Sequence, residues 1–160
     1  IKTLSFSIAS GRSYFNVPAK INSLEGKFSM KSSSKTEMIK ETTVTREMLA
    51  DAVGSGSLRV YATPMAAALC ENAAAALAQE YVDDGCTTVG TMLCVEHTSP
   101  TPVGGHVRAK AVLTGIDGRK FSFSLTVCDD AGEIMRGTHE RVSVKLESFQ
   151  KKANEKFIQK

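Results

Sequence analysis

Three side chains are candidates for nucleophilic or acid–base catalysis because of their type and position in the sequence: the hydroxyl of Thr63, the carboxylate of Glu71 and the imidazole of His97. Thr63 precedes Pro64, and this pair predicts a helix start with Thr63 as the N-cap and Pro64 at the first helical position. A helix start also presents free N–H groups and a positive dipole end, where an oxyanion would be stabilised. Capping is the simpler interpretation of Thr63, and catalysis is the alternative.

Glu71 lies eight residues after Thr63 in an apolar, alanine-rich stretch. Eight helical steps correspond to about 80° around the axis and ~12 Å along it, so direct contact between the two side chains is not expected. The carboxylate would either face solvent or occupy a pocket, where burial would raise its pKa and suit it to act as a base or nucleophile. The sequence leaves both alternatives open.

His97 is one of three histidines and falls at the end of a predicted strand. Imidazole titrates near neutral pH, so His97 is a candidate general acid or base, although a single histidine at a strand end is more often structural. His106 lies on the polar phase of its predicted strand, as on a solvated face, and His139 carries no stronger signal. Both are therefore weaker candidates than His97.

These side chains need a helix and a sheet to position them. Eight alanines give residues 63–80 a strong helix propensity with little side-chain bulk, and an acidic pair followed by Gly85 ends the helix. Upstream, the pattern predicts a short edge strand at residues 39–44 and a short helix at residues 45–53, before a Gly/Ser loop.

Four strand-like runs follow the helix, at residues 89–98, 105–115, 120–128 and 133–146. Apolar and polar residues alternate most clearly in the second and third runs, and Asp117-Gly118 between them is a strong hairpin signal. Consecutive strands joined by tight turns predict an antiparallel meander. A central helix followed by such a sheet is the α+β order of a hotdog fold, in which an antiparallel sheet wraps around one alanine-rich helix, but other single-helix α+β folds share it.

Composition excludes several functions. The net charge of +3 comes from residues 1–29, because residues 30–160 hold 16 basic and 16 acidic side chains. No basic run is interleaved with aromatic residues, so no nucleic-acid partner is expected. The four cysteines form no CxxC pair, and the sequence contains no metal-ligand cluster, phosphate loop or G-x-S-x-G elbow. No apolar run reaches the ~18 residues of a membrane span, which favours a cytoplasmic protein without a membrane partner.

Residues 1–29 are basic and serine-rich, a composition typical of an organellar transit segment. Met30 opens a polar stretch, and the sequence itself begins at Ile1, so we favour Met30 as the natural start behind a dispensable leader. In either case the folded domain is expected at residues 30–160. An organellar location is expected only if residues 1–29 are a genuine transit segment.

Several short segments in a fixed order are similar to the fluoroacetyl-CoA thioesterase-like family. They are Val60-Tyr61-Ala62-Thr63, Glu71, Val89-Gly90-Thr91, Cys94-Val95-Glu96-His97-Thr98, Thr101-Pro102 and Gly137-Thr138-His139-Glu140-Arg141. The resemblance covers roughly residues 57–150, and its last segment is the most specific. It implies a hotdog-fold acyl-CoA thioesterase that acts as a homodimer or higher oligomer, with CoA as part of the substrate and no further cofactor.

The resemblance also implies site residues. Thr63, Glu71 and His97 match the catalytic set that acts on the thioester, with Glu71 as nucleophile or general base. Gly90 matches a glycine whose backbone approaches the substrate, and Arg141 matches an arginine that anchors a carboxylate or the substrate. The alternatives are a non-catalytic acyl-CoA-binding hotdog module and a hotdog enoyl-CoA hydratase or dehydratase.

One departure from the family pattern bears on the substrate. Members that specialise in fluoroacetyl-CoA carry bulky aromatic residues in the lid-like stretch before the helix, whereas this sequence has Gly-Ser-Gly-Ser at residues 54–57. A small or medium acyl-CoA of ordinary metabolism is therefore the expected substrate, because fold and family do not determine the acyl group.

Overall fold

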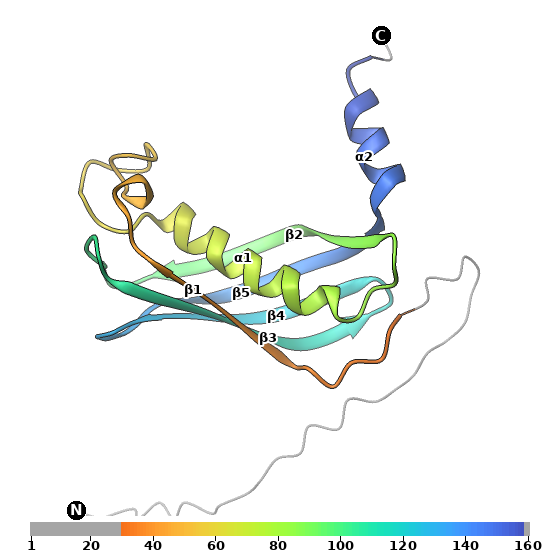
Figure 1. Ribbon diagram of the computed structural model, residues 1–160, viewed down its shortest axis with the longest axis horizontal. Coiled ribbons are helices and arrows are strands. Elements are labelled where there is room, and N and C mark those ends of the chain that lie inside the picture. Colours follow the sequence, from red (N-terminus) through yellow and green to blue (C-terminus); the bar gives the residue numbers. More distant parts are fainter. Residues whose placement is uncertain (1–29, 159–160) are drawn as a thin grey trace, which may run out of the picture.

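The computed structural model describes residues 30–158, so the predicted leader at residues 1–29 lies outside the described residues. Within them, five strands form one antiparallel sheet that curves around the long helix α1 (Figure 1). The elements are β1 (Glu37–Thr43), the 3₁₀ turn η1 (Arg46–Met48), α1 (Thr63–Gln79), β2 (Cys86–His97), β3 (His106–Asp117), β4 (Lys120–Asp129), β5 (Gly132–Lys145) and α2 (Leu146–Glu155). The predicted α+β arrangement is confirmed.

Helix α1 approaches the sheet closely because its buried face consists almost entirely of small side chains. The buried residues of this face are Ala66, Cys70, Ala73, Ala74, Leu77 and Ala78. The sheet fills the remaining space with the alternating apolar side chains predicted from the sequence: Val107, Ala109 and Ala111 of β3 and Phe121, Phe123, Leu125 and Val127 of β4. Small residues on the helix therefore face large residues on β4, and the core lies between them.

The strand order is β1-β3-β4-β5-β2, so the predicted meander is correct only for β3, β4 and β5. Strand β2 pairs with β5 at one edge of the sheet, and β1 pairs with β3 at the other edge. The reason is the connection after β2, which is too long for a hairpin and passes the start of α1. There the Tyr61 N–H donates to the Thr101 carbonyl at 2.8 Å, and the Gly104 N–H donates to the Val44 carbonyl at 2.8 Å. Strands β1 and β2 are thus the sheet edges.

The helix expected at residues 45–53 is wrong beyond the single turn η1. Leu49 adopts an extended conformation, with φ −82° and ψ 153°, and forms an isolated β-bridge with Tyr61. Its side chain is only 2% exposed, so it belongs to the core. Tertiary pairing with the segment that enters α1 therefore overrides the local helix propensity.

A partly buried side-chain hydrogen bond holds the end of the molecule where α1 begins. The Thr101 hydroxyl donates to Asp129 Oδ2 at 2.7 Å, and Asp129 Oδ1 accepts from the Ala131 and Gly132 N–H groups. The Thr101 contact is the main reason that the pKa of Asp129 is lowered. The loop after β2 is thereby tied to the β4–β5 turn, and Tyr61 ties it to the entry of α1.

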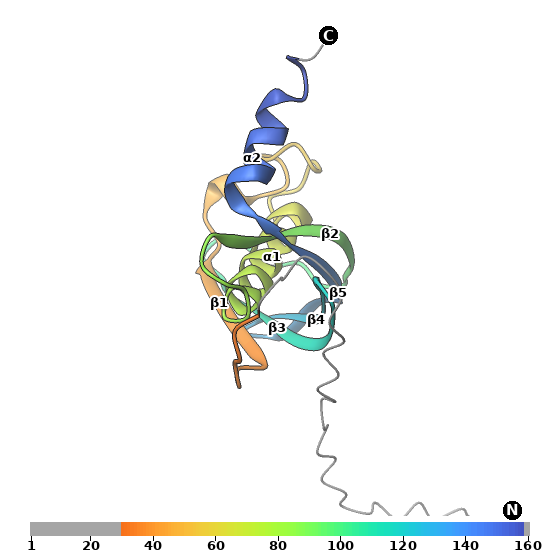
Figure 2. The same cartoon turned by 90° about the vertical axis from the view of Figure 1, so that its right-hand side faces the viewer.

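Helix α2 extends away from the sheet rather than packing along it (Figures 1 and 2). It starts directly after β5, where the Leu146 N–H donates to the Gly85 carbonyl at 3.0 Å. None of its residues is buried. In the part of the chain that the structure describes, no helix is long and apolar enough to cross a membrane.

Candidate functional site

The predicted N-cap role of Thr63 is wrong, because Ala62 occupies the N-cap position and Thr63 is already helical. The Ala62 carbonyl accepts from the N–H groups of Met65 and Ala66, each at 3.0 Å. The Thr63 hydroxyl is used elsewhere. Its Oγ1 lies 2.9 Å from Nδ1 of His97, which projects from the end of β2. A helix start and a strand end thus hold a hydroxyl and an imidazole in direct contact.

The environment of His97 favours the neutral ring. Burial lowers the pKa of His97, and a backbone contact with Ser99 opposes this effect. Its Nε2 is buried and has no hydrogen-bond partner among the described residues. A neutral imidazole whose Nδ1 accepts the Thr63 hydroxyl proton would act as a base toward that hydroxyl.

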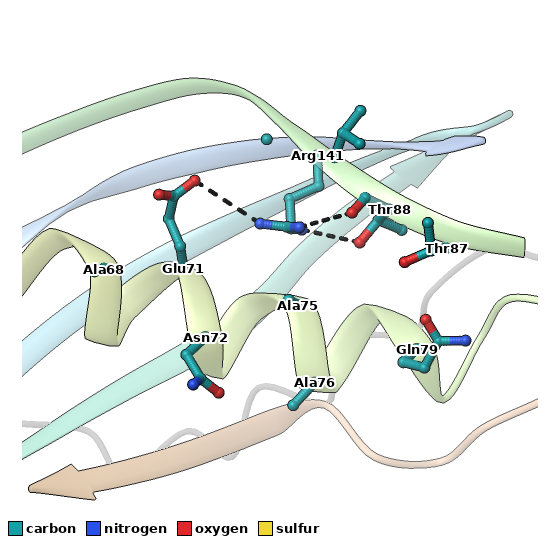
Figure 3. A pocket seen from close by; sticks show the side chains of 11 residues that line it. Ala68, Glu71, Asn72, Ala75, Ala76, Gln79, Thr87, Thr88 and Arg141 are labelled. Carbon is teal, nitrogen blue, oxygen red and sulfur yellow. Dashed lines mark hydrogen bonds and ion pairs between the residues drawn. The ribbon is translucent and has the colours of Figure 1, made fainter. Parts of the chain in front are cut away.

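Glu71 lines a cavity of about 760 Å³ between α1 and β2 that is widely open to solvent (Figure 3). The wall from α1 consists of Ala68, Glu71, Asn72, Ala75, Ala76 and Gln79, and the opposite wall of Thr87, Thr88, Val89, Gly90 and Arg141. The Glu71 side chain is 45% exposed, so it lies in a pocket and yet retains contact with solvent. Its placement combines the two alternatives that the sequence left open.

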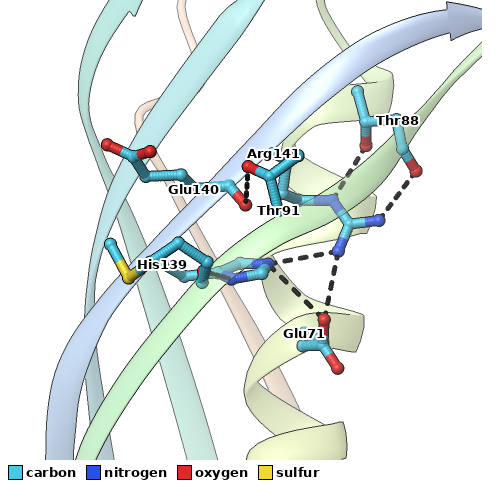
Figure 4. Close-up of polar contacts among 7 residues, drawn as sticks. Glu71, Thr88, Thr91, His139, Glu140 and Arg141 are labelled. Carbon is cyan, nitrogen blue, oxygen red and sulfur yellow. Dashed lines mark hydrogen bonds and ion pairs between the residues drawn. The ribbon is translucent and has the colours of Figure 1, made fainter.

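Arg141 is the cation that faces Glu71 across the cavity (Figure 4). Its Nε donates to Thr88 Oγ1 at 2.9 Å and its Nη2 donates to the Thr88 carbonyl at 2.8 Å. Its Nη1 lies 3.9 Å from Glu71 Oε1. Burial lowers the pKa of the Arg141 guanidinium and the charge of Glu71 opposes this effect, so the group remains a cation.

His139 joins this cluster, although its position in the sequence makes it only a weak candidate. Its side chain is 1% exposed, and its Nε2 lies 3.2 Å from Arg141 Nη1 and 3.8 Å from Glu71 Oε1. His139 and Arg141 are two residues apart on β5, so both face the helix side of the sheet. This two-residue spacing is the feature of the sequence that could have identified His139, because it places His139 on the same face of the strand as Arg141, a predicted substrate-binding residue.

Gly90 supplies the space in which the Glu71 carboxylate lies. A Cβ atom at this position would be 2.7 Å from Glu71 Oε1 and 3.1 Å from His139 Cε1. Contacts below 3.0 Å do not occur without movement of one partner. A glycine at this point of β2, beside the irregular pairing between Gly90 and Met92, therefore lets the carboxylate approach the strand.

The predicted site residues fall into two groups in one protomer. Thr63 and His97 form one group, and Glu71, Gly90 and Arg141 form the other. Within residues 30–158, no hydrogen bond or ion pair connects the Thr63–His97 pair to Glu71. The eight residues from Thr63 to Glu71 correspond to ~12 Å along the helix axis, as the sequence led us to expect.

Comparisons with known proteins agree on one family. The family model described as FlK, fluoroacetyl-CoA-specific thioesterase, matches residues 44–147. A fluoroacetyl-CoA thioesterase from Streptantibioticus cattleyicolor is 37% identical over 97 residues, which cover 61% of this chain and 70% of that protein.

Solved structures give the same result for the fold. A structure of the fluoroacetyl-CoA thioesterase FlK superposes with a TM-score of 0.73 at 28% identity, covering 78% of this chain and 98% of that chain. A thioesterase superfamily member from Thermus thermophilus superposes with a TM-score of 0.70 at 22% identity, covering 78% and 94%. The predicted hotdog fold is thereby confirmed.

Proposed function

Because the chain belongs to the fluoroacetyl-CoA-specific thioesterase family, we propose that it hydrolyses a small or medium acyl-CoA thioester to the free acid and CoA. Thioester hydrolysis is the activity that the family match supports, rather than acyl-CoA binding alone or enoyl-CoA hydration. The observation that carries the proposal is the cavity between α1 and β2, where Glu71 lies beside Gly90 and Arg141. A carboxylate with a fixed cation beside it can act on a carbonyl brought into that space.

The acyl group is assigned as small or medium because of the segment before α1. Residues 54–57 are Gly-Ser-Gly-Ser and are exposed, and the neighbouring Leu58 is 69% exposed. Residues 54–58 contain no aromatic side chain that could cover a two-carbon acyl group, and Tyr61 after them is buried in the core. We therefore do not expect this chain to share the fluoroacetyl-CoA specificity of the relative from Streptantibioticus cattleyicolor.

In the proposed mechanism, backbone N–H groups near the start of α1 in one protomer and at Gly90 in the other protomer of a dimer polarise the thioester carbonyl. Glu71 either activates a water molecule as a base or attacks the carbonyl to form an acyl intermediate that water then cleaves. The proton that the attacking water loses passes to His97, which is in contact with the Thr63 hydroxyl, and from His97 to the CoA sulfur that has left the acyl carbon. The products are a carboxylic acid and a free thiol.

A homodimer formed through β2 is part of this proposal. Strand β2 is an edge of the sheet and also a wall of the cavity, so a second copy paired along it would close the open side. Antiparallel pairing of two β2 strands would bring the His97 end of one strand beside the Cys86 end of the other. The Thr63–His97 pair of one protomer would then approach the cavity of its partner, which accounts for the separation of the two groups.

Mixed dimers test this arrangement. Thr63→Ala and Glu71→Gln chains are each expected to be nearly inactive alone. Refolded together at equal concentration, they should recover about a quarter of wild-type activity, because half of the dimers are hybrids and one of their two sites is intact. No recovery, with hybrid dimers demonstrated by mass spectrometry, would place the whole site in one protomer. A monomeric elution profile of active enzyme would overturn the dimer.

Release of CoA tests the reaction itself. The full chain is incubated with acyl-CoA substrates from acetyl-CoA to octanoyl-CoA, and a thiol reagent detects the product, with Glu71→Gln as the matched blank. Turnover of at least one substrate is expected. No release from any of them would leave the acyl-CoA-binding alternative, whereas loss of enoyl absorbance from crotonyl-CoA without thiol release would indicate a hydratase.

Gly90→Ala is expected to lower kcat by a factor on the order of ten while the protein remains folded, because the added methyl group displaces the Glu71 carboxylate. The measurement is kcat on the best acyl-CoA together with the melting temperature. Gly115→Ala is the matched control, since a Cβ atom there meets nothing within 4 Å on β3. Equal kinetics for both variants would show that the space at Gly90 has no role in catalysis.

A cytoplasmic location also belongs to the proposal. All four cysteines are free thiols in the described residues, and free thiols persist in a reducing compartment. We expect a full-chain fluorescent fusion to be distributed through the cytoplasm and a chain without residues 1–29 to keep its activity. Import of the fusion into an organelle would identify residues 1–29 as a transit segment.

A further inference from the structure

His139 has no part in the mechanism above, yet its ring contacts both members of the Glu71–Arg141 pair. It lies on the helix side of β5 with Arg141, and its side chain is almost completely buried (Figure 4). The ring also packs near Phe123, with centroids 6.2 Å apart. A buried imidazole at this position has a fixed orientation, so the two ring nitrogens can be assigned separately.

The contacts determine which nitrogen carries the proton. Nδ1 of His139 is 2.7 Å from the Met92 carbonyl oxygen, which can only accept a hydrogen bond. Nδ1 therefore carries the proton. Nε2 is 3.2 Å from Arg141 Nη1, which can only donate, so Nε2 presents a lone pair. Both contacts require the same neutral tautomer.

The neutral ring is also favoured electrostatically. Burial is the main reason that the pKa of His139 is lowered, and the charge of Arg141 lowers it further, while the Met92 carbonyl and Glu71 oppose the shift. Because Nε2 has no proton, its 3.8 Å approach to Glu71 Oε1 is not an ion pair. Arg141 Nη1 is the donor that stands between the two acceptors.

These contacts define the direction of the guanidinium. Thr88 accepts from Nε and Nη2, which holds one edge of the group against β2. His139 accepts from Nη1, the nitrogen that faces Glu71. One N–H of Nη1 thus donates to the His139 ring, and the other points toward the Glu71 carboxylate.

We propose that His139 is a positioning residue: held as the Nδ1-protonated neutral tautomer, it directs Arg141 Nη1 toward Glu71 and so fixes the carboxylate in the cavity. The inference rests on the proposed function, in which Glu71 acts on the thioester. Gly90 supports it, because the space left by the missing side chain admits the carboxylate beside His139 Cε1. His139 itself neither touches the reacting atoms nor exchanges a proton with them.

Two amide substitutions separate the two ring contacts. In His139→Gln the amide oxygen reaches the position of Nε2 and can still accept from Arg141. In His139→Asn the shorter amide reaches the position of Nδ1, where it can donate to the Met92 carbonyl but leaves Arg141 Nη1 without an acceptor. The two variants have similar polarity, so a merely structural role would affect both alike.

Kinetics are measured for both variants on the best acyl-CoA, with the melting temperature. His139→Asn is expected to lower kcat by a factor on the order of ten with little change in KM, and His139→Gln should keep kcat within about threefold of wild type. Equal losses of kcat in both variants, or losses that follow the melting temperature, would overturn the proposal.

A second measurement does not depend on activity. Nitrogen-15 NMR of the wild-type chain should show Nδ1 of His139 protonated and Nε2 unprotonated between pH 6.5 and 8. The Arg141 Nη signals should broaden in His139→Asn and remain separate in His139→Gln. A protonated Nε2 would refute the assigned tautomer. An inactive wild-type protein with the expected NMR result would instead refute the proposed function and leave the arrangement of His139 and Arg141 standing.

Discussion

Glu71→Gln is expected to lower kcat by a factor on the order of 10² or more, with only a small change in melting temperature. The amide has the shape of the carboxylate and can still accept from Arg141, but it is neither a base nor a nucleophile. The Glu71 side chain is 45% exposed and its ion pair with Arg141 is long, at 3.9 Å, so loss of the charge costs little stability. Turnover and thermal unfolding are measured on the same preparations.

His106→Ala is the control for this experiment. The His106 side chain is 40% exposed and its Nε2 lies 3.8 Å from Glu41 Oε2, as expected for a solvated face. It should change neither turnover nor melting temperature.

The double mutant Glu71→Gln with His97→Ala should be little worse than the poorer single mutant, because the effects of residues that act together are strongly non-additive. If Glu71→Gln retains more than about half of wild-type turnover, the assignment of Glu71 is wrong.

Thr63→Ala and His97→Ala are each expected to lower kcat by a factor on the order of 10², and the double mutant should be no worse than about threefold below them. The hydroxyl and the ring share one hydrogen bond at 2.9 Å, so removal of either atom ends the same interaction. Stability should fall by only about 1 kcal/mol, the typical value of one hydrogen bond, because Thr63 does not cap α1. Additive losses in the double mutant would contradict a shared role.

The pH dependence of kcat provides a further readout for this pair. Burial lowers the pKa of His97 below its ordinary value of 6.5, so the ring is neutral at pH 7 and becomes protonated only under more acidic conditions. Protonation would remove the lone pair that accepts the Thr63 proton. Turnover should therefore be constant above pH 6.5 and fall as the pH decreases through the lowered pKa. An activity that rises on acidification would assign the opposite protonation state to His97.

Local patterns in the sequence located α1, β3 and β4, whereas the helix predicted at residues 45–53 was wrong beyond η1 and α2 was not predicted. Thr63-Pro64 and the acidic run before Gly85 located α1 at both ends, and strict alternation located β3 and β4 within one or two residues. These signals depend on backbone conformation and on one buried face, both of which the sequence shows directly. The resemblance to a known family then supplied the fold, which the solved structures confirm.

Long-range contacts could not be predicted from the same patterns. Leu49 is extended because it pairs with Tyr61, and β2 joins β5 because its following loop crosses the start of α1. Each outcome depends on residues distant in the sequence. Thr63 shows the same limitation: its local sequence favours capping, but His97, 34 residues later, lies within hydrogen-bond distance of its hydroxyl.

The residues of the candidate site were predicted from the sequence, but their division into two separate groups was not. Glu71, Gly90 and Arg141 were expected from the family pattern and lie together, and their catalytic and binding roles stay predictions. His139 is a weak candidate in the sequence because a single histidine on a strand does not show which residues it contacts. The two-residue spacing places His139 on the same face of β5 as Arg141, and the register of β5 with β2, which places Arg141 opposite Gly90, brings both near Glu71.

The alanine-rich wall of the cavity has a consequence for the entropy of binding. Three of the six residues that α1 contributes to the wall are alanines, namely Ala68, Ala75 and Ala76. An alanine side chain has no rotamers to lose, so a ligand that packs against these methyl groups orders nothing on the helix. The cost of immobilising side chains, about 0.5–1.5 kcal/mol for each flexible residue, is confined to the larger residues of the cavity. Much of this surface is therefore already in its bound conformation before any substrate arrives.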